Sequence, residues 1–380
     1  MSPVWLEDPC PLPESVLWTR HVAFYNERGV DVWSNDLVPT QVTTNTYIGQ
    51  AYAGMILDHI QSMEYDPREP VYVVEIGAGS GRLAFHVVNA LQRMAGADAP
   101  RIVYVMTDLV PKSVEAWRRH PQLRDLAELG LLDMGVFDCE SPGAIELQYG
   151  EGRLLDNAEH NPIVLVANYV LDSLRHDLIQ AQDGRVCRVH VRAGVSKKQQ
   201  PRLHLVPQRD EQLVYGDADV DALIDTYARE LERSRVLVPV VAIQMLRWWM
   251  DRAKGGFLLL LADKMQRSLA DLDHTRHPDL VSHGTDGCIS VVVNAQAIAH
   301  VFESEGGQVR HARSYDDSFT ISAFTTCPNV AFDRNFNRWL DDPGPADVQR
   351  LFDAIDDLKE PPIALILPLL RYSCYDDFVV

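Results

Sequence analysis

The chain has 380 residues, and 54 Asp or Glu against 35 Lys or Arg give it a formal net charge of −19. Because binding to a nucleic-acid backbone depends on clustered Lys and Arg, this balance argues against a nucleic-acid partner and favours a small-molecule or protein substrate. The six cysteines are scattered without a C-x-x-C pair, a pattern typical of reduced thiols that predicts neither a disulfide framework nor a metal site.

The opening of the chain carries Glu7, Asp8 and Glu14, unlike an apolar targeting signal. The longest apolar runs, at 257–262 and 363–370, are too short to cross a bilayer. We therefore expect a cytoplasmic protein with no membrane partner, either a monomer or a homodimer; an organellar location is the alternative.

The first 65 residues combine aromatic anchors with one clear helix. Apolar side chains recur at helical spacing over residues 47–62, and residues 43–46 offer N-caps for this helix. Residues 66–70 then form a loop with two prolines, which delivers the chain to the first strand.

Residues 71–82 dominate the sequence. Apolar and β-branched residues surround the acid Glu75, and Gly77, Gly79 and Gly81 follow at every second position. This pattern predicts a buried parallel strand, a sharp turn in which glycine supplies φ > 0, and a helix that starts at Arg82. The amino end of such a helix favours an anionic group.

The spacing of the glycines limits which class of ligand the loop can bind. A dinucleotide fingerprint needs G-x-G-x-x-G, and here Arg82 occupies the place of its last glycine, which argues against a nicotinamide-dependent oxidoreductase. The G-x-G-x-G spacing behind Glu75 resembles motif I of class I S-adenosyl-L-methionine (SAM) dependent methyltransferases. The resemblance implies that this loop faces the methionine part of the cofactor, whose zwitterion the acid helps to position. The implied contacts are Glu75, Gly77, Ala78, Gly79, Gly81 and Arg82. The alternative is a glycine-rich turn without a ligand.

Two further strands end in acids. Residues 101–108 end at Asp108, which is followed by Leu109, and residues 130–138 end at Asp138, which is followed by Cys139. In a doubly wound sheet the carboxyl ends of the strands beside the switch point form the binding crevice. We expect Asp108 to accept hydrogen bonds from the ribose hydroxyls. In the methyltransferase pattern that the sequence resembles, the residues after the second of these strands bracket the adenine, so we expect Asp138 to contact its amino group. A helix N-cap and a turn acid remain the respective alternatives. Leu109 and Cys139 are further expected cofactor contacts.

The fourth strand, residues 161–168, ends at Asn168 and runs into Tyr169. In the methyltransferase pattern this strand end lies beside the transferable methyl group, so Asn168 also counts as a cofactor contact. We predict that Asn168 and Tyr169 orient the acceptor and that Asp172 and His176 are candidate bases. The alternatives are a turn residue at Asn168 and, for Asp172 and His176, surface side chains four apart on a helix.

The rest of the chain continues an α/β pattern. Residues 185–192 and 202–207 predict an antiparallel hairpin inserted in the sheet order, and residues 255–263 a further buried strand. The other expected elements are a helical stretch at 218–252, a strand at 288–294, a helix at 295–305, strands at 309–313 and 318–324, and a tail helix near 346–358. His274, His277 and His283 match no metal-ligand spacing and indicate solvated loop histidines.

Several segments together resemble the MidA-like group (DUF185) of class I methyltransferases. Residues 33–50 are similar to the segment leading into that group's first long helix, and Ala167-Asn-Tyr-Val-Leu-Asp-Ser-Leu174 resembles its Asn-Glu-x-x-Asp-Ala-Leu-Pro motif. The group includes a mitochondrial protein that methylates an arginine of a complex I subunit. This chain has Tyr169 in place of the motif's Glu and Arg175 in place of its Pro, which argues against an arginine acceptor.

We therefore expect a Rossmann-like α/β fold with a mostly parallel sheet and helices on both faces. The expected domains are a helical cap at 1–65, a methyltransferase core at 66–330 with an insertion at about 180–252, and a helical extension at 331–380. The expected activity is methyl transfer from SAM to an oxygen or nitrogen acceptor on a small molecule or protein, with S-adenosyl-L-homocysteine as product. The alternative is a SAM-binding assembly protein without turnover.

Overall fold

The computed structural model describes residues 4–34, 44–97, 99–195, 201–207, 213–274, 280–283, 288–313, 320–341 and 378. The chain divides into two compact units. The core unit comprises Gly29–Tyr169, Arg247–Ala262 and Gly307–Val380, and the accessory unit comprises Met1–Arg28, Val170–Leu246 and Asp263–Gly306.

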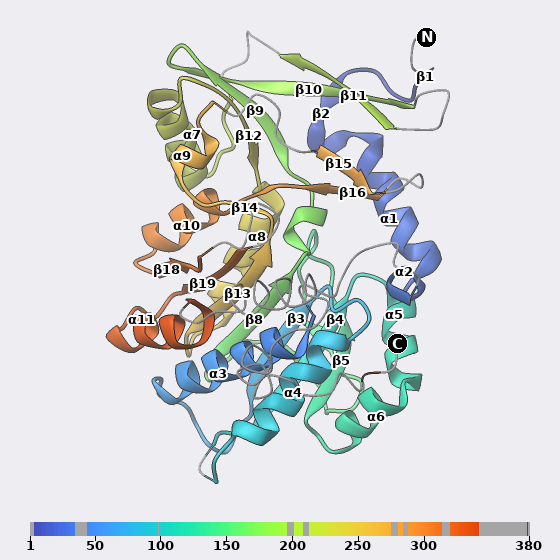
Figure 1. Ribbon diagram of the computed structural model, residues 1–380, viewed down its shortest axis with the longest axis vertical. Helices are drawn as coiled ribbons and strands as arrows, with labels where there is room; N and C mark the ends of the chain where they lie inside the picture. Colours follow the sequence, from blue (N-terminus) through green and yellow to red (C-terminus); the bar gives the residue numbers. More distant parts are fainter. Residues whose placement is uncertain are drawn as a thin grey trace, which may run out of the picture. The chain divides into compact units, whose positions relative to one another are not determined.

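A seven-stranded sheet organises the core unit, with strand order β18-β19-β13-β8-β3-β4-β5 (Figure 1). Neighbouring strands from β13 to β5 are parallel, whereas β18 and β19 are antiparallel. The Thr326 amide donates to the Phe257 carbonyl (3.0 Å), so the end of β19 lies beside the start of β13 and these strands run in opposite directions. In chain order the strands are β3 (Val71–Ile76), β4 (Ile102–Asp108), β5 (Leu132–Val136), β8 (Ile163–Asn168), β13 (Phe257–Asp263), β18 (Gln308–His311) and β19 (Thr320–Thr325).

Helices cover this sheet because its central strands are apolar on both faces, as in α/β proteins. The two helices α3 (Thr46–Gln61) and α4 (Arg82–Met94) lie side by side (Figure 1). Asn45 caps α3, since its side-chain oxygen accepts the amides of Tyr47 and Ile48 at 3.1 Å each. The other helices with residues in this unit are α2 (Asp31–Ser34), α5 (Pro111–Arg119), α6 (Pro121–Glu128), α8 (Val240–Arg252), α11 (Val330–Phe336) and the π-helical turn η3 (Asn337–Asp341), and a short ladder joins β6 (Ile145–Glu146) to β7 (Arg153–Leu154).

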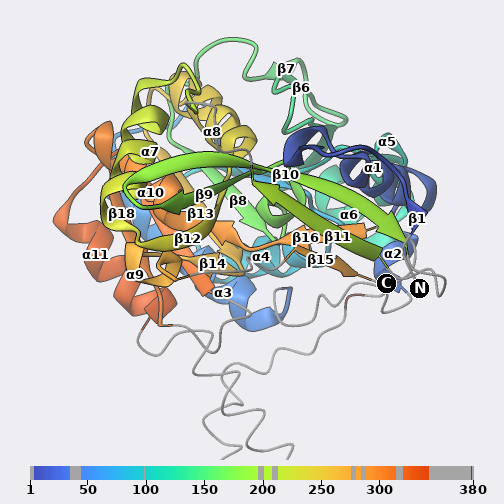
Figure 2. The same ribbon diagram turned by 90° about the horizontal axis from the view of Figure 1, so that it is seen from above.

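A second, six-stranded sheet organises the accessory unit. Its long strand β10 (Arg185–Val195) pairs antiparallel with β9 (Asp177–Gln182) over residues 185–188 and with β11 (Pro201–Pro207) over residues 189–195; Figure 2 shows these strands in green. The remaining strands of this sheet are β1 (Val4–Trp5), β2 (Cys10–Pro11) and β12 (Arg233–Val238). The same unit contains η1 (Leu12–Glu14), α1 (Val16–Arg28), η2 (Leu171–Ser173), α7 (Ala218–Glu230), β14 (Met265–Gln266), α9 (Leu269–Leu272), β15 (Leu280–His283), β16 (Cys288–Val291), β17 (Val293–Asn294) and α10 (Ala295–Ser304).

The predicted α/β fold with a mostly parallel central sheet is confirmed, and three details differ. The hairpin at 185–207 forms, but it belongs to the second sheet and is not inserted in the first. The stretch 218–252 is not helical throughout, because β12 separates α7 from α8. Ser234 and Val236 on β12 are buried and alternate with more exposed neighbours, as expected of a strand, and β12 pairs with β9. The strand β16 pairs with β15 and not with the central sheet.

Other predictions concern short segments or residues outside the described ranges. His274 lies exposed just after α9, and His283 ends β15. His277 and the tail helix expected near 346–358 lie outside the described residues.

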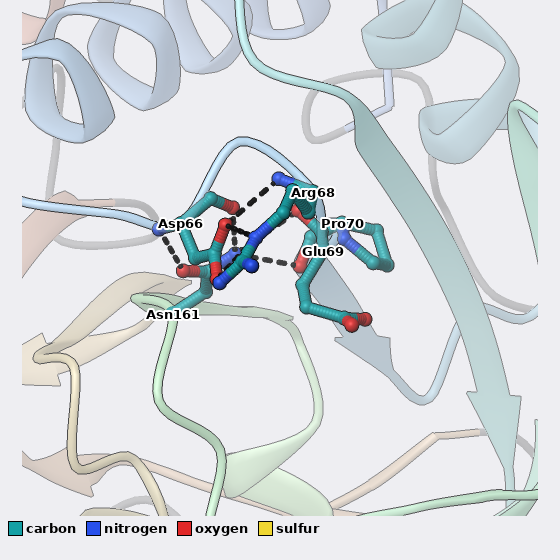
Figure 3. Close-up of polar contacts among 5 residues, drawn as sticks. All are labelled: Asp66, Arg68, Glu69, Pro70 and Asn161. Carbon is teal, nitrogen blue, oxygen red and sulfur yellow. Dashed lines mark hydrogen bonds and ion pairs between the residues drawn. The ribbon is translucent and has the colours of Figure 1, made fainter.

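Asn161 fixes the loop that enters the central sheet (Figure 3). Its buried side chain accepts the Asp66 amide (2.7 Å) and donates to the carbonyls of Asp66 (3.1 Å), Glu69 (3.1 Å) and Pro70 (3.2 Å). Arg68 pairs with Asp66 in the same loop, but this ion pair is exposed. The clamp therefore joins the amino ends of β3 and β8 through one amide group.

Asn161→Ala is expected to lower the free energy of unfolding by about 2–3 kcal/mol, because it leaves several backbone groups of the loop without a partner. Urea denaturation would measure this loss. The matched control is Arg68→Ala, which breaks only the exposed ion pair and should leave stability nearly unchanged. Equal effects of the two substitutions would show that the amide clamp does not hold the loop.

Candidate active site

The glycine loop follows β3 directly. Gly77, Gly79 and Gly81 all have positive φ, of 63°, 55° and 81°, the region that glycine enters without strain. The Ala78 amide donates to the Thr107 carbonyl (2.9 Å) and the Gly81 amide to the Ala78 carbonyl (2.9 Å). Arg82 then begins α4, so the loop leads straight into a helix amino end, as the sequence predicts.

Gly79 is enclosed by side chains from other elements. The Trp117 indole N–H donates to the Gly79 carbonyl (2.9 Å), and the Asp108 carboxylate accepts the Gly79 amide. A Cβ atom at Gly79 would lie 2.9 Å from Cε2 of Trp33. This position therefore requires glycine for its backbone angle and for the closeness of the indole ring.

Glu75 lies near the end of β3 with only 3% of its surface exposed. Its carboxyl oxygen accepts a hydrogen bond from the Tyr104 hydroxyl (3.1 Å), and its carbonyl accepts one from the Thr107 hydroxyl (2.8 Å). The pKa of Glu75 is raised to about 8, mainly by burial and also by the nearby Asp108, against the lowering effect of the Tyr104 hydroxyl. The folded chain therefore holds Glu75 protonated at neutral pH.

This protonation predicts a specific pH dependence of stability. Between pH 4.5 and about 8 the unfolded chain ionises Glu75 while the folded chain keeps the proton, so rising pH favours unfolding. Relative to Glu75→Gln, the wild type should lose roughly 3 kcal/mol of unfolding free energy from pH 5 to pH 7.5. Urea titrations at three pH values measure the difference, and Glu146→Gln, at an exposed position on β6, is the control. A constant difference between wild type and Glu75→Gln would contradict the prediction.

The ends of β4 and β5 bring together the predicted ribose and adenine residues. Asp108 accepts the Val110 amide (2.9 Å), and burial raises its pKa to about 6. It is not the N-cap of α5, which Val110 occupies without a side-chain cap. Leu109 beside it is an apolar side chain left 40% exposed, a surface that a flat ring system could cover.

Asp138 accepts the Glu140 amide (2.8 Å), which stabilises a turn after β5. The thiol of Cys139 has a raised pKa because it is buried and because Asp138 and Asp108 lie near it. These three side chains therefore gather at one edge of the sheet. The turn role and a ligand role are compatible for Asp138.

Asn168 and Tyr169 stand at the carboxyl end of β8, beside β3. The hydroxyl of the fully buried Tyr52, on α3, donates to Asn168 Oδ1 (2.8 Å). Tyr169 has φ of 48° although it is not glycine. Such strained residues persist where the surroundings hold them, and they cluster at functional sites.

Asp172 and His176 belong to the accessory unit. The alternative interpretation, that they are surface side chains four residues apart on a helix, is wrong. Only Leu171–Ser173 are helical there, in a short 3₁₀ turn, and both side chains are buried. His176 Nε2 bonds to the Leu171 carbonyl (2.9 Å), and burial lowers the pKa of His176 to about 4. His176 is therefore neutral at pH 7.

Asp172 lies in a polar cluster that the sequence did not reveal. Its two carboxyl oxygens accept the hydroxyls of Ser290 (2.7 Å) and Ser173 (3.0 Å), and its amide donates to Asp263 (3.2 Å). Lys264 donates to Ser290 from the other side. Burial, and then the charge of Asp172, raise the pKa of Asp263 well above its usual range, so Asp263 keeps its proton beside Asp172.

Sequence reasoning missed Tyr52, Tyr104 and Asp263. The two tyrosines occupy apolar positions of a helix and a strand, and nothing in the local pattern shows where a hydroxyl points. Asp263 did carry a signal, since it is an acid at the end of a buried strand.

Comparison with known proteins identifies the family. Residues 52–264, more than half of the chain, match a family model described as "Putative S-adenosyl-L-methionine-dependent methyltransferase". No curated protein matches the sequence. Within the described residues no group of His, Cys, Asp or Glu could hold a metal ion, and no helix is long and apolar enough to span a membrane.

Two solved structures from Burkholderia thailandensis share the fold. One is an uncharacterized COG1565 superfamily protein with 13% identity and a TM-score of 0.53, aligned over 85% of this chain and 90% of its own. The other is a COG1565 superfamily member bound to S-adenosyl-homocysteine, with 12% identity and a TM-score of 0.50, aligned over 87% of this chain and 98% of its own. At these identities the likeness concerns the fold.

The glycine loop fits the cofactor of this family. Three left-handed glycines keep side chains away from the loop, and an exposed Leu109 with two acids stands at the neighbouring strand ends. The chain belongs to this family of S-adenosyl-L-methionine-dependent methyltransferases, as a divergent class I enzyme.

Proposed function

We propose that the chain transfers the methyl group of SAM to an oxygen or nitrogen acceptor on a small molecule or protein. The observation that carries this proposal is Tyr169, held in the left-handed region directly after Asn168 at the carboxyl end of β8. Ligands of open α/β sheets bind outside such strand ends. A strained aromatic residue at this place supports a role in orienting the acceptor.

The proposed cofactor contacts divide by part of the ligand. The loop residues Gly77, Ala78, Gly79, Gly81 and Arg82 would hold the methionine part together with Glu75 and Asn168. Asp108 and Leu109 would hold the ribose, and Asp138 and Cys139 the adenine. The closeness of Cys139 to Asp108 and Asp138 supports one continuous ligand along this edge.

When bound, the cofactor would supply an electrophilic methyl group on a sulfonium, and the neutral thioether S-adenosyl-L-homocysteine would be the group that leaves. The protein's task is to orient the acceptor and to remove its proton where it carries one. We propose that Asp172 is the base that accepts this proton, since both of its oxygens accept hydrogen bonds from hydroxyl groups, as a carboxylate does. Ser290 and Asp263 would position this carboxylate, and His176 remains a second candidate base.

A base favours an acceptor that loses a proton, such as a hydroxyl or an amine, over a carboxylate. Tyr169 stands where the MidA-like motif has Glu, and this substitution also supports the alternative of a SAM-binding assembly protein without turnover. We further propose a divergent MidA-like, cytoplasmic enzyme, either monomer or homodimer, in which residues 1–65 and 331–380 flank the catalytic core at 66–330.

Transfer of label from [methyl-³H]SAM tests the proposal. The purified protein is incubated with the protein fraction and, separately, the small-molecule fraction of an extract of the source organism. Labelled product that depends on the enzyme supports turnover and shows the acceptor class. Binding of SAM by calorimetry without label transfer in either fraction would favour the assembly protein, and absence of SAM binding would reject both.

A further inference from the structure

The carboxyl group of Glu75 is buried without a counter-charge. It lies on β3 in the central sheet of the core unit, where its oxygen accepts a hydrogen bond from the Tyr104 hydroxyl at 3.1 Å. Within the part of the chain that the structure describes, no Lys, Arg or His forms an ion pair with it. Burying an unpaired charge is costly, so the group is neutral in the free protein.

The groups around Glu75 explain why this neutral state is stable. Tyr104 and Asp108 face it from β4, and Tyr52 faces it from α3. Tyr52 in turn donates to Asn168 on β8. None of these neighbours is a cation: Asp108 disfavours ionisation of the Glu75 carboxyl group, and the Tyr104 hydrogen bond, which favours it, does not offset the cost of burial.

The inference rests on the proposed function, because it requires the cofactor to sit at the glycine loop that follows Glu75. We propose that binding of SAM releases the proton of Glu75, and that Tyr104 is the positioning residue whose hydroxyl donates a hydrogen bond to the resulting carboxylate. SAM carries a sulfonium and an ammonium group against one carboxylate. Its cationic charge would supply the counter-charge that the protein lacks.

The proton balance is simple. The neutral acid and the cationic ligand form a carboxylate–cation complex, and one proton passes to the solvent. Below the pH at which free Glu75 ionises, affinity for SAM should therefore rise up to tenfold per pH unit. Tyr104 stabilises the ionised form through its hydroxyl bond, so it helps to set the pH at which this coupling ends.

Isothermal titration calorimetry measures the released proton directly. The full-length protein is titrated with SAM at pH 7 in phosphate and in Tris, whose ionisation enthalpies differ, and the difference in heat gives the number of protons. We expect close to one proton for the wild type and none for Glu75→Gln. Tyr104→Phe should keep the proton release, but the pH at which the affinity stops rising should shift to a higher value.

Two comparisons make the test specific. Tyr227→Phe removes another buried hydroxyl, which bonds to Asn294 and Gln296, and should leave the proton count unchanged. S-adenosyl-L-homocysteine lacks the sulfonium charge, so equal release with both ligands assigns the effect to the ammonium group.

SAM binding without proton release in the wild type would overturn the inference and leave the proposed function intact. Equal release from Glu75→Gln would also overturn it. Absence of SAM binding would overturn both. If Glu75→Gln does not fold, the wild-type count and the Tyr104→Phe pH profile still decide the question.

Discussion

Gly79→Ala is expected to weaken SAM binding by at least about 100-fold, which corresponds to about 2.7 kcal/mol. An alanine at φ of 55° is strained by roughly 1–2 kcal/mol. Its methyl group would also meet the Trp33 ring at 2.9 Å, so either the loop or the indole must move. Calorimetric titration with SAM measures the loss, and circular dichroism checks the fold.

Gly130→Ala is the matched control for this substitution. Gly130 has φ of 71°, but a Cβ atom there meets nothing within 4 Å. It therefore introduces similar backbone strain without the collision and should bind SAM like the wild type. Wild-type affinity in Gly79→Ala would show that the cofactor does not depend on this loop.

Asp172→Asn is expected to reduce the rate of methyl transfer by about 10²- to 10⁴-fold, the usual contribution of a positioned base. The amide keeps the size of the side chain and can still bond to Ser290 and Ser173, so folding and SAM affinity should be retained. The measurement is the rate of S-adenosyl-L-homocysteine release at saturating SAM, with the acceptor found by label transfer.

Asp177→Asn provides the comparison, because Asp177 is another buried acid of the accessory unit. It accepts Arg188 (2.9 Å) and Tyr215 (2.8 Å), which indicates a structural role. This variant should lose stability but keep its turnover rate. An unchanged rate in Asp172→Asn would remove Asp172 from the proposed mechanism and leave His176 as the candidate base.

The sequence predicts the central strands of this sheet well because β3, β4, β8 and β13 consist mostly of apolar residues. The stretch 71–82, for example, contains the expected strand (Val71–Ile76), the glycine turn and a helix that starts at Arg82. The second sheet could not be predicted in the same way. Its strand β9 reads Asp-Leu-Ile-Gln-Ala-Gln, a pattern without clear alternation, and β12 lies between two true helices.

The same distinction between local and distant determinants holds for the residues of the candidate active site. Backbone-determined positions, such as Gly79 and Asp108, follow from a motif, because a turn and a strand end fix them locally. Tyr52 and Tyr104 could not be found in this way, since their hydroxyl partners belong to other strands. The surroundings of Asp172 likewise depend on Ser290, which lies far along the chain and contacts it only in the folded protein.

The interleaving of the two units has a consequence for how this protein is made. The chain passes from one unit to the other five times, so neither unit corresponds to a single continuous stretch that could be synthesised alone. Strands β18 and β19 complete the core sheet, yet they leave the ribosome after the whole accessory unit. Strand β13, whose outer neighbour is β19, must therefore wait with one open edge until β19 is made, a situation in which slow folding and aggregation are expected. Fragments that end before residue 325 should consequently depend on chaperones, and full-length expression is the sound route to every experiment above.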